Sequence, residues 1–305
     1  MPDGSITPFV VFRPADDGSQ AHTASRGVVI LWPGFGMGAR YYRPMALELA
    51  RRGFGVVVGE LRGQGNQTAV SSWRDNWGYQ DMASQDYVAA VEVARSEFGS
   101  SEVESSKAND SEADDSRETS ATKTLPVYLM CHSMGGQIAS VYLTRPNADV
   151  DGVMGVGSGT PHYVNFTGSE YKRLRFGSPV MAIVSFFAGY WPSKPLDFAG
   201  YGRQARRHVL EWVRFAQTGK LRPLNAEYDY AEAMKKVTTP VLFTTCAGDR
   251  DCPIESANAL ARMLPRAAKT EFIDHRLGHN RWAREPQAIA DRLEKFIEEI
   301  PSWQV

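Results

Sequence analysis

A serine in the stretch LMCHSMGGQI, residues 129–138, has the neighbours expected of an enzymatic nucleophile. The stretch nearly matches the pattern G-x-S-x-G, in which a sharp turn between a strand and a helix exposes the serine oxygen. Cys131 stands where the pattern has its first glycine. A cysteine is small and apolar, so it strains this turn without forbidding it. Ser133 is therefore the candidate nucleophile, and the backbone N–H of Met134 is a candidate donor to a developing oxyanion.

A serine hydroxyl is a weak nucleophile until a base takes its proton and an acid orients that base. In chains with this serine turn, the acid and then the histidine follow along the sequence. Asp249 comes directly after the apolar segment 239–248, and His279 lies in a short loop ahead of the last predicted helix. Asp251 and His275 are the alternatives for the acid and the base. The order of these residues predicts a triad of serine, histidine and aspartate.

The glycine-rich loop WPGFGMGARYYRP, residues 32–44, follows the first long apolar segment. Gly34 and Gly36 allow the backbone to approach a reacting carbon closely, which makes them candidate substrate-binding residues. The N–H of Phe35, between them, is the expected second donor to the oxyanion.

The same glycines permit a competing interpretation. GFGMGA, residues 34–39, also matches the dinucleotide-binding pattern G-x-G-x-x-A, and Glu60 ends the next apolar segment. Pro44, however, would lie in the first turns of the helix that has to bind the phosphates. This interpretation also leaves Ser133 and its partners without a role. A dinucleotide-binding protein therefore stays as an alternative.

Apolar runs and amphipathic segments alternate along the chain, which predicts an α/β fold: a mostly parallel central sheet with helices on both faces. Continuous apolar runs are typical of strands that are buried on both faces of such a sheet. The predicted strands are 27–33, 54–60, 125–131, 150–158 and 239–248. The predicted helices are 41–53, 81–98, one starting at Met134, and 286–300.

Two segments interrupt this alternation. Residues 99–124 carry seven acidic and three basic side chains and almost no large apolar residue, which predicts a disordered acidic insert. Residues 160–235 are rich in aromatic side chains, and 204–217 has the period of an amphipathic helix. We expect this second segment to form a helical lid over the carboxyl ends of the strands.

The predicted organisation is therefore a core of 1–158 and 237–305 with a lid of 159–236 between its two parts. Four bulky side chains are further candidates for contact with a substrate. His132 precedes the candidate nucleophile, and three aromatic residues belong to the lid: Tyr163, Trp191 and Trp212. The other lid aromatics are expected to form its own core.

Composition limits the classes of function. The 305 residues carry a net charge of −1, which gives no indication of a nucleic-acid partner or a membrane surface. No apolar run has the roughly 20 residues of a transmembrane helix, and the first residues do not resemble a signal peptide. Three cysteines without metal-binding spacing predict a reduced, cytoplasmic protein with no disulfide framework and no metal site.

Several motifs together resemble the lidded serine esterases, monoacylglycerol lipases and lysophospholipases of the α/β-hydrolase superfamily. The motifs are PGFG (33–36), ELRGQGNQ (60–67), CHSMGG (131–136) and GDRDCP (248–253). NWGYQD (76–81) is similar to a bacterial subgroup of predicted α/β-hydrolases. In the family the acid lies four residues before a proline, and this spacing implies Asp249 rather than Asp251. Cys131, Pro33 and Glu60 depart from the family pattern of Gly, His and Asp, but no catalytic group is lost.

The resemblance implies a serine hydrolase that cleaves an ester of an apolar acyl or aryl group through an acyl-enzyme, without a cofactor. Its partner would be a small-molecule ester. The same triad would also serve an acyltransferase, a small peptidase or a C–C bond hydrolase. A non-catalytic binding protein on this fold is the alternative of another class. The oligomeric state and the natural substrate do not follow from the sequence.

Overall fold

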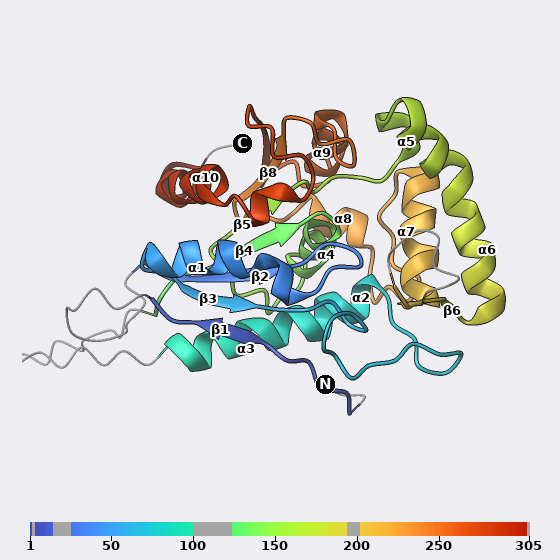
Figure 1. Cartoon of the computed structure of the whole chain (residues 1–305), viewed down its shortest axis with the longest axis horizontal. Coiled ribbons are helices and arrows are strands. Elements are labelled where there is room, and N and C mark those ends of the chain that lie inside the picture. The colour runs from blue at the N-terminus through green and yellow to red at the C-terminus, as the bar shows by residue number, and fades with distance from the viewer. Residues whose placement is uncertain (2–3, 15–25, 100–123, 194–201, 304–305) are drawn as a thin grey trace, which may run out of the picture.

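The computed structural model describes residues 1, 4–14, 26–99, 124–193 and 202–303. Its central sheet has seven strands in the order β1-β3-β2-β4-β5-β8-β9 (Figure 1). β1 runs antiparallel to β3, and the other neighbouring pairs are parallel. The strands are β1 (Val10–Phe12), β2 (Val28–Trp32), β3 (Gly55–Val58), β4 (Val127–His132), β5 (Gly152–Val156), β8 (Val241–Cys246) and β9 (Ala268–Ile273). Residues 100–123, nearly the whole predicted acidic insert, lie outside the described residues.

Helices cover both faces of this sheet, as predicted. Successive side chains of a strand point to opposite faces, so Ile30 belongs to one apolar core and Leu31 to the other. Both are buried, which explains the continuous apolar run of β2. One face carries α1 (Arg43–Arg51) and α10 (Gln287–Glu299). The other carries α3 (Tyr87–Phe98), α4 (Met134–Tyr142) and α9 (Ile254–Ala261).

The strand order reverses its direction between β2 and β4. The chain passes from β2 outward to β3 and then returns to β4 on the other side of β2. Loops that follow two such strands leave toward opposite faces of the sheet and open a crevice at its carboxyl edge. The loop of residues 33–38 and Ser133 follow β2 and β4, so the fold brings them to this crevice.

Two strands of the central sheet were not predicted from the sequence, and both lie at its edges. β1 has three residues and β9 reads AKTEFI, with exposed and partly exposed side chains between its buried ends. An edge strand has one neighbour and is partly solvated, so neither segment shows the continuous apolar run that marks the central strands. β9 matters for the site because the chain that leaves it carries His279.

The segment between β5 and β8 is mainly helical and includes the helix predicted at 204–217 (Figure 1). Its helices are α5 (Gly168–Lys172), α6 (Ser178–Ala188), α7 (Arg206–Thr218) and α8 (Tyr230–Met234). Two short strands, β6 (Tyr190–Trp191) and β7 (Gln204–Ala205), pair with each other in antiparallel orientation. The remaining short helices are α2 (Tyr79–Asp81), η1 (Ala39–Tyr42), η2 (Met82–Asp86), η3 (Tyr163–Asn165), η4 (Arg173–Gly177), η5 (Arg281–Ala283) and η6 (Ile300–Ser302).

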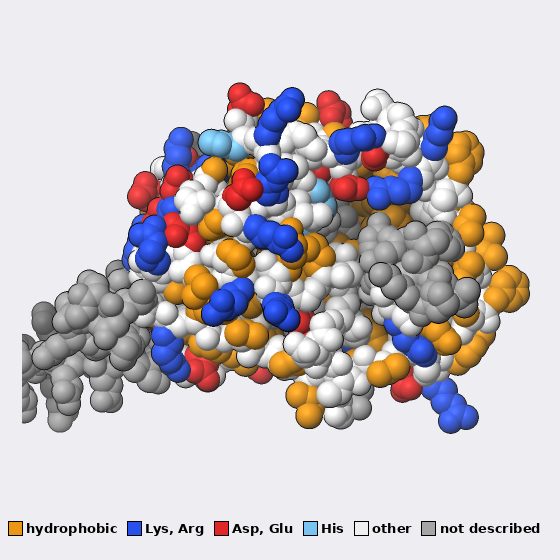
Figure 2. Space-filling view, viewed as in Figure 1, with side chains coloured by type: hydrophobic (Ala, Val, Ile, Leu, Met, Phe, Trp, Pro, Cys, Tyr) orange, Lys and Arg blue, Asp and Glu red, His pale blue; other side chains and the backbone are white. Residues whose placement is uncertain are grey.

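α6 and α7 present different surfaces. Figure 2 shows apolar side chains along the edge that α6 forms, where Val180, Ile183, Phe186 and Phe187 are exposed. The inner residues of α7 are instead buried toward the core. Within the described residues, no helix is both long and apolar enough to span a bilayer.

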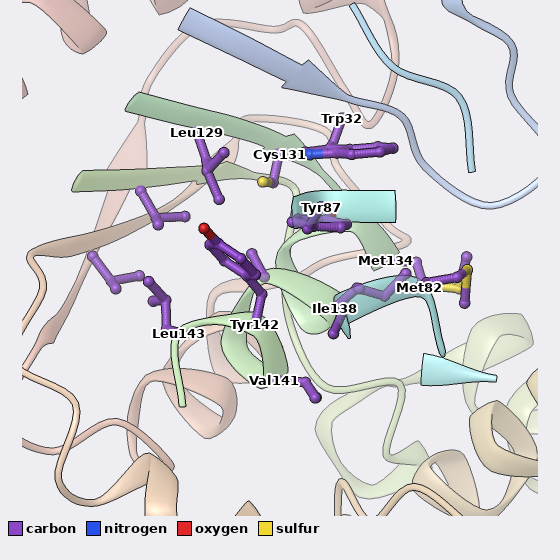
Figure 3. Close-up of a cluster of buried hydrophobic side chains, with 14 of the residues drawn as sticks. Trp32, Met82, Tyr87, Leu129, Cys131, Met134, Ile138, Val141, Tyr142 and Leu143 are labelled. Atoms are coloured by element: carbon purple, nitrogen blue, oxygen red, sulfur yellow. The ribbon is translucent and has the colours of Figure 1, made fainter. Parts of the chain in front are cut away.

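Cys131 is a packing residue at the end of β4. Its side chain is fully buried and lies beside the stacked rings of Trp32 and Tyr87, whose centroids are 4.3 Å apart (Figure 3). Burial raises the pKa of the Cys131 thiol well above its ordinary value. Such a thiol is protonated at neutral pH and unreactive. All three cysteines are free and buried. The cytoplasmic location predicted from them stays a prediction.

The packing around Cys131 gives a first prediction. We expect Cys131→Ala to keep its activity, whereas Cys131→Leu should overpack the contact with Trp32 and Tyr87 and lose about 1–3 kcal/mol of unfolding free energy. Urea unfolding and ester hydrolysis measure the two effects. Rapid inactivation of the native protein by iodoacetamide, prevented by Cys131→Ala, would contradict the assignment of this cysteine to packing.

Candidate active site

The turn around Ser133 has the strained backbone that an exposed nucleophile requires. Ser133 joins β4 to α4 with φ 51° and ψ −117°, and it is the one non-glycine residue with positive φ among the described residues. Its N–H donates to the carbonyl of Val156 at 2.9 Å, which fixes the turn to β5. A Cβ atom on Gly135 would lie 2.9 Å from the carbonyl oxygen of Pro33, so this position has to be glycine. Both positions are those that the pattern G-x-S-x-G singles out.

Ser133, His279 and Asp249 form a continuous hydrogen-bonded chain. His279 Nδ1 lies 2.9 and 3.0 Å from the two carboxylate oxygens of Asp249, and its Nε2 lies 3.0 Å from Ser133 Oγ. A carboxylate can only accept, so Nδ1 carries the proton and Nε2 is left to accept from the serine hydroxyl. This is the tautomer in which a histidine can act as a general base toward serine.

The structure distinguishes the two candidate acids. The side chain of Asp249 is 1 % exposed, and its Oδ1 also accepts the backbone N–H groups of Asp251 and Cys252 at 2.9 and 2.8 Å. The carboxylate of Asp251 forms an ion pair with Arg173 instead. The alternative base, His275, is exposed in the loop after β9.

The charge of Asp249 determines the protonation behaviour of His279. Burial alone lowers the pKa of His279, but the hydrogen bond and negative charge of Asp249 outweigh it, so the pKa lies above the ordinary 6.5. Asp251 raises this pKa further and Arg173 lowers it, both through their charges. His279 therefore accepts a proton more readily than a free imidazole does.

His132 holds the backbone of His279 in place. Its Nε2 lies 3.0 Å from the carbonyl oxygen of His279, which also accepts from Trp282 Nε1 at 3.0 Å. A carbonyl only accepts, so His132 Nε2 carries the proton and His132 Nδ1 accepts from the Tyr42 hydroxyl at 2.6 Å. Complete burial, together with the nearby His279, lowers the pKa of His132 well below 6.5, so it stays neutral.

Tyr42 connects this network to the glycine-rich loop. The N–H of Gly34 donates to the Tyr42 hydroxyl at 3.0 Å. Pro33 occupies the place of the histidine that the family pattern has in this loop, and Tyr42 supplies a hydrogen bond to the loop from η1. One chain of hydrogen bonds thus runs from Gly34 through Tyr42 and His132 to the backbone of His279.

A cavity of about 330 Å³ opens onto Ser133 and His279. Four candidate substrate-binding residues line it: Gly34, Gly36, His132 and Trp212. The other two candidates are absent from the described lining. Trp191 is fully buried in a small apolar core with Met181 and Val209. Tyr163 lies under the guanidinium of Arg175, 5.2 Å from the ring centroid. A helical segment needs its own core, and its largest side chains serve that need first.

Several lining residues were not predicted from the sequence. Phe166, Leu174 and Arg173 reach the cavity from the segment between β5 and β8, and Gln137 reaches it from α4. The Gln137 amide accepts from the Tyr79 hydroxyl and donates to the carbonyl of Gly159, both at 2.7 Å. Nothing in the spacing of these residues marks them, because they come from separate elements that meet only in the fold.

Glu60 does not face a crevice as a ribose-binding acid would. It is 2 % exposed, and its carboxylate accepts the N–H groups of Ala39 at 2.9 Å and Asn66 at 2.6 Å. The acid therefore ties the glycine-rich loop to the loop after β3. In the described part of the chain, no three His, Cys, Asp or Glu side chains lie together in a way that could hold a metal ion.

Comparison with known sequences identifies the family. The sequence model of the Alpha/beta hydrolase family matches residues 29–292. The chain belongs to this family. No curated protein matches the chain closely enough to serve as a relative.

Solved structures share the fold at low sequence identity. An esterase from Exiguobacterium antarcticum is 15% identical with a TM-score of 0.59, and the match covers 97% of each chain. MenH from S. aureus is 15% identical with a TM-score of 0.58, over 96% of this chain and 98% of that one. A bromoperoxidase from Bacillus anthracis is 14% identical with a TM-score of 0.56, over 96% of each chain. These neighbours carry different names, and at this low identity the likeness establishes the fold alone.

The connection through Tyr42 gives a second prediction. Tyr42→Phe should leave the Gly34 N–H and His132 Nδ1 without their partner, at a cost of about 1–3 kcal/mol in unfolding free energy. It should also lower kcat, because both the loop and His279 lose a support. Urea unfolding and ester kinetics measure these effects.

Tyr41→Phe is the matched control for this variant. The Tyr41 hydroxyl donates to the carbonyl of Asn280 at 3.1 Å in an exposed position, so its loss should cost less than about 0.5 kcal/mol. Equal losses in the two variants would show that the buried network does not have the assigned role.

Proposed function

We propose that this protein is a serine hydrolase that cleaves carboxylic esters through an acyl-enzyme. Ser133 Oγ attacks the ester carbonyl carbon while His279 Nε2 takes the hydroxyl proton and Asp249 stabilises the imidazolium. The tetrahedral intermediate collapses, and the leaving alcohol takes the proton from His279. Water, deprotonated by His279, then attacks the acyl-serine and releases the acid. The observation that carries this proposal is the Ser133–His279–Asp249 chain, with contacts of 2.9–3.0 Å, at the strained turn.

The oxyanion would be stabilised by backbone N–H groups. Met134 is the first residue of α4, where a helix leaves its N–H groups without partners inside the helix. Phe35 lies in the loop that the Gly34–Tyr42 hydrogen bond fixes beside Ser133. We assign both N–H groups to the developing negative charge, because oriented backbone donors require no reorganisation during the reaction.

The cavity favours a small or medium-sized ester with an apolar part. Its volume of about 330 Å³ is at the small end of the range for ligand sites. Phe35, Phe166, Leu174 and Trp212 offer apolar contacts near Ser133. Acyl transfer, peptide cleavage and C–C bond cleavage can use the same three residues, and a panel of esters, amides and acyl acceptors separates them.

We further propose that residues 159–236 form the part that covers the substrate. Phe166, Arg173, Leu174 and Trp212 come from this segment and line the cavity together with Ser133 and His279 from the core. The ion pair of Arg173 with Asp251 joins the segment to the loop that carries the acid. The segment therefore supplies specificity, while the core supplies the chemistry.

The nucleophile is tested by Ser133→Ala. Hydrolysis of p-nitrophenyl butyrate should fall roughly 10⁴–10⁶-fold in kcat, as in other triad knockouts. An active-site-directed phosphonate should label Ser133 in the native protein, which mass spectrometry of the digested protein would locate. Unchanged hydrolysis by the variant, or labelling at another residue, would refute the serine-hydrolase proposal.

The acid is tested by comparing Asp249→Asn with Asp251→Asn. Asp249→Asn should lower kcat about 10⁴-fold because it removes the partner that fixes the tautomer of His279. Asp251→Asn should keep most of the activity. In the native protein kcat/KM should rise with pH as His279 loses its proton, with a midpoint above 6.5 because Asp249 raises its pKa. A pH–rate profile measures this midpoint.

Asp251→Asn also tests the electrostatic contribution. Because the charge of Asp251 raises the pKa of His279, its removal should move the midpoint to lower pH. A larger loss of kcat in Asp251→Asn than in Asp249→Asn would reassign the acid.

A further inference from the structure

The motif NWGYQD, residues 76–81, has no part in the reaction described above, yet it contacts the segment between β5 and β8 along its whole length. The side-chain oxygen of Asn76 accepts the N–H of Arg207 at 2.7 Å. The carbonyl of Trp77 accepts the N–H of His208 at 3.0 Å. These two bonds occupy N–H groups in the first turn of α7, which have no partners inside the helix. The motif therefore caps α7 from the core.

Glu211, one turn further along α7, binds the backbone of the same motif through its side chain. Its carboxylate accepts the N–H of Tyr79 at 2.7 Å and that of Leu224 at 2.6 Å, while the residue is only 4 % exposed. A Cβ atom on Gly78 would lie 2.3 Å from a carboxylate oxygen of Glu211, so only glycine lets this side chain reach the backbone.

The rest of the motif completes the contact. The Gln80 side chain accepts the N–H of Glu227 at 2.9 Å. Asp81 pairs with Arg207 at 2.9 Å and accepts from the Asn225 amide at 3.2 Å. All six consecutive residues of the motif thus take part in holding α7 and the chain after it on the core.

The inner face of α7 contacts the side chains of Phe35 and Met134, the two residues whose backbone N–H groups we assign to the oxyanion. His208 is fully buried, its Nε2 donates to Met134 Sδ at 2.8 Å, and its ring lies 4.9 Å from that of Phe35. Trp212, four residues later and on the same face of the helix, lies 5.9 Å from the Phe35 ring. The side chains of Phe35 and Met134 are therefore supported by one helix from outside the core.

His208 is an unusual choice for packing alone. A thioether sulfur only accepts, so Nε2 carries the proton and Nδ1 is an acceptor, for which no partner exists among the described residues. An unpaired buried nitrogen destabilises the folded state, and an apolar ring of similar size would avoid that cost. Complete burial lowers the pKa of His208 to about 3, so the ring that contacts Phe35 and Met134 is neutral.

We propose that α7 is a fixed wall of the oxyanion site, held by NWGYQD and Glu211, and that His208 is a positioning residue for Phe35 and Met134. The helix is then a permanent part of the catalytic apparatus, and any movement that admits substrate occurs in other parts of the segment. The effect of His208 on catalysis rests on the serine-hydrolase function proposed above. The docking of α7 on the core does not depend on that function.

The first test is kinetic and uses His208→Phe, which keeps a ring of similar size and removes the polar contact with Met134. We expect kcat for p-nitrophenyl butyrate to fall about 10-fold or more, less than the 10²–10³ of losing an oxyanion donor outright. KM should change less than about 3-fold, because the oxyanion exists only after substrate is bound. The melting temperature should stay equal or rise, since an unpaired buried nitrogen is removed.

A merely structural role predicts a different pattern for this variant. It would lower the melting temperature and leave the kcat of the folded fraction unchanged, and that result would overturn the proposal. Arg214→Gln is the matched control, because Arg214 is exposed on the outer side of α7. It should alter neither kcat nor the melting temperature.

The second test needs no activity and therefore distinguishes this inference from the proposed function. In native protein, amides of α7 should exchange with deuterium as slowly as those of α4, within about 10-fold. Glu211→Gln puts an amide nitrogen against one of the two N–H donors, so exchange in α7 should become faster while exchange in α4 stays the same. Fast exchange of α7 in the native protein would overturn the proposal even if Ser133 is the nucleophile. Slow exchange in a protein without esterase activity would refute the proposed function and retain the docking.

Discussion

The left-handed backbone of Ser133 is the constraint on which the site depends. A non-glycine residue with φ of 51° has a strained backbone. Such a conformation persists only where several contacts with the surrounding structure hold it. Here the N–H of Ser133 is bound to β5, and the carbonyl of Gly135 accepts from the Tyr87 hydroxyl at 2.6 Å. β4 is buried inside the sheet and α4 packs on one of its faces, and this burial supplies the stability that offsets the strain of the turn. As a result, the Oγ atom of Ser133 points away from β4 and α4 toward His279.

His279 is also held by several contacts, although it lies in a loop. Its ring is oriented by Asp249, and its carbonyl accepts from both His132 and Trp282. The low pKa of buried His132 keeps that ring neutral, so no second positive charge opposes protonation of His279. A mobile loop would lose these contacts each time it moved, and His279 Nε2 would then lie within hydrogen-bond distance of Ser133 Oγ only part of the time. The hydrogen bonds convert a loop residue into a positioned one.

The segment between β5 and β8 combines two physical roles. Its α7 is bound to the core through backbone N–H groups and a buried carboxylate, and it contacts the side chains of Met134 and Phe35. Its α6 carries exposed apolar side chains on the opposite side (Figure 2). Cavity-lining residues such as Leu174 and Arg173 lie in the chain that precedes α6. The segment thus shapes the cavity, while the sheet positions Ser133.

The sequence by itself determined the central strands, the serine turn and the order of the three residues, because these are local properties. Apolar runs such as 27–33 must be buried on both sides, and the small residues around Ser133 are required by one tight turn. Edge strand β9 was missed because a half-solvated strand has no such run. Between Asp249 and Asp251 the sequence offered only the spacing to Pro253. The structure adds that Asp249 contacts His279 while Asp251 pairs with Arg173, because two acids two residues apart differ in where their side chains point.

Tertiary structure alone decided the remaining site. Trp191 and Tyr163 were expected at the substrate but pack elsewhere, while Gln137 and Leu174 line the cavity without any local signal. Pairs such as Tyr42 with His132, 90 residues apart, and Tyr79 with Glu211, 132 residues apart, cannot be predicted from spacing. The physical reason is that a turn or a strand is specified by neighbours in the chain, whereas a cavity and a buried hydrogen bond are specified by groups that meet only when the whole sheet has formed.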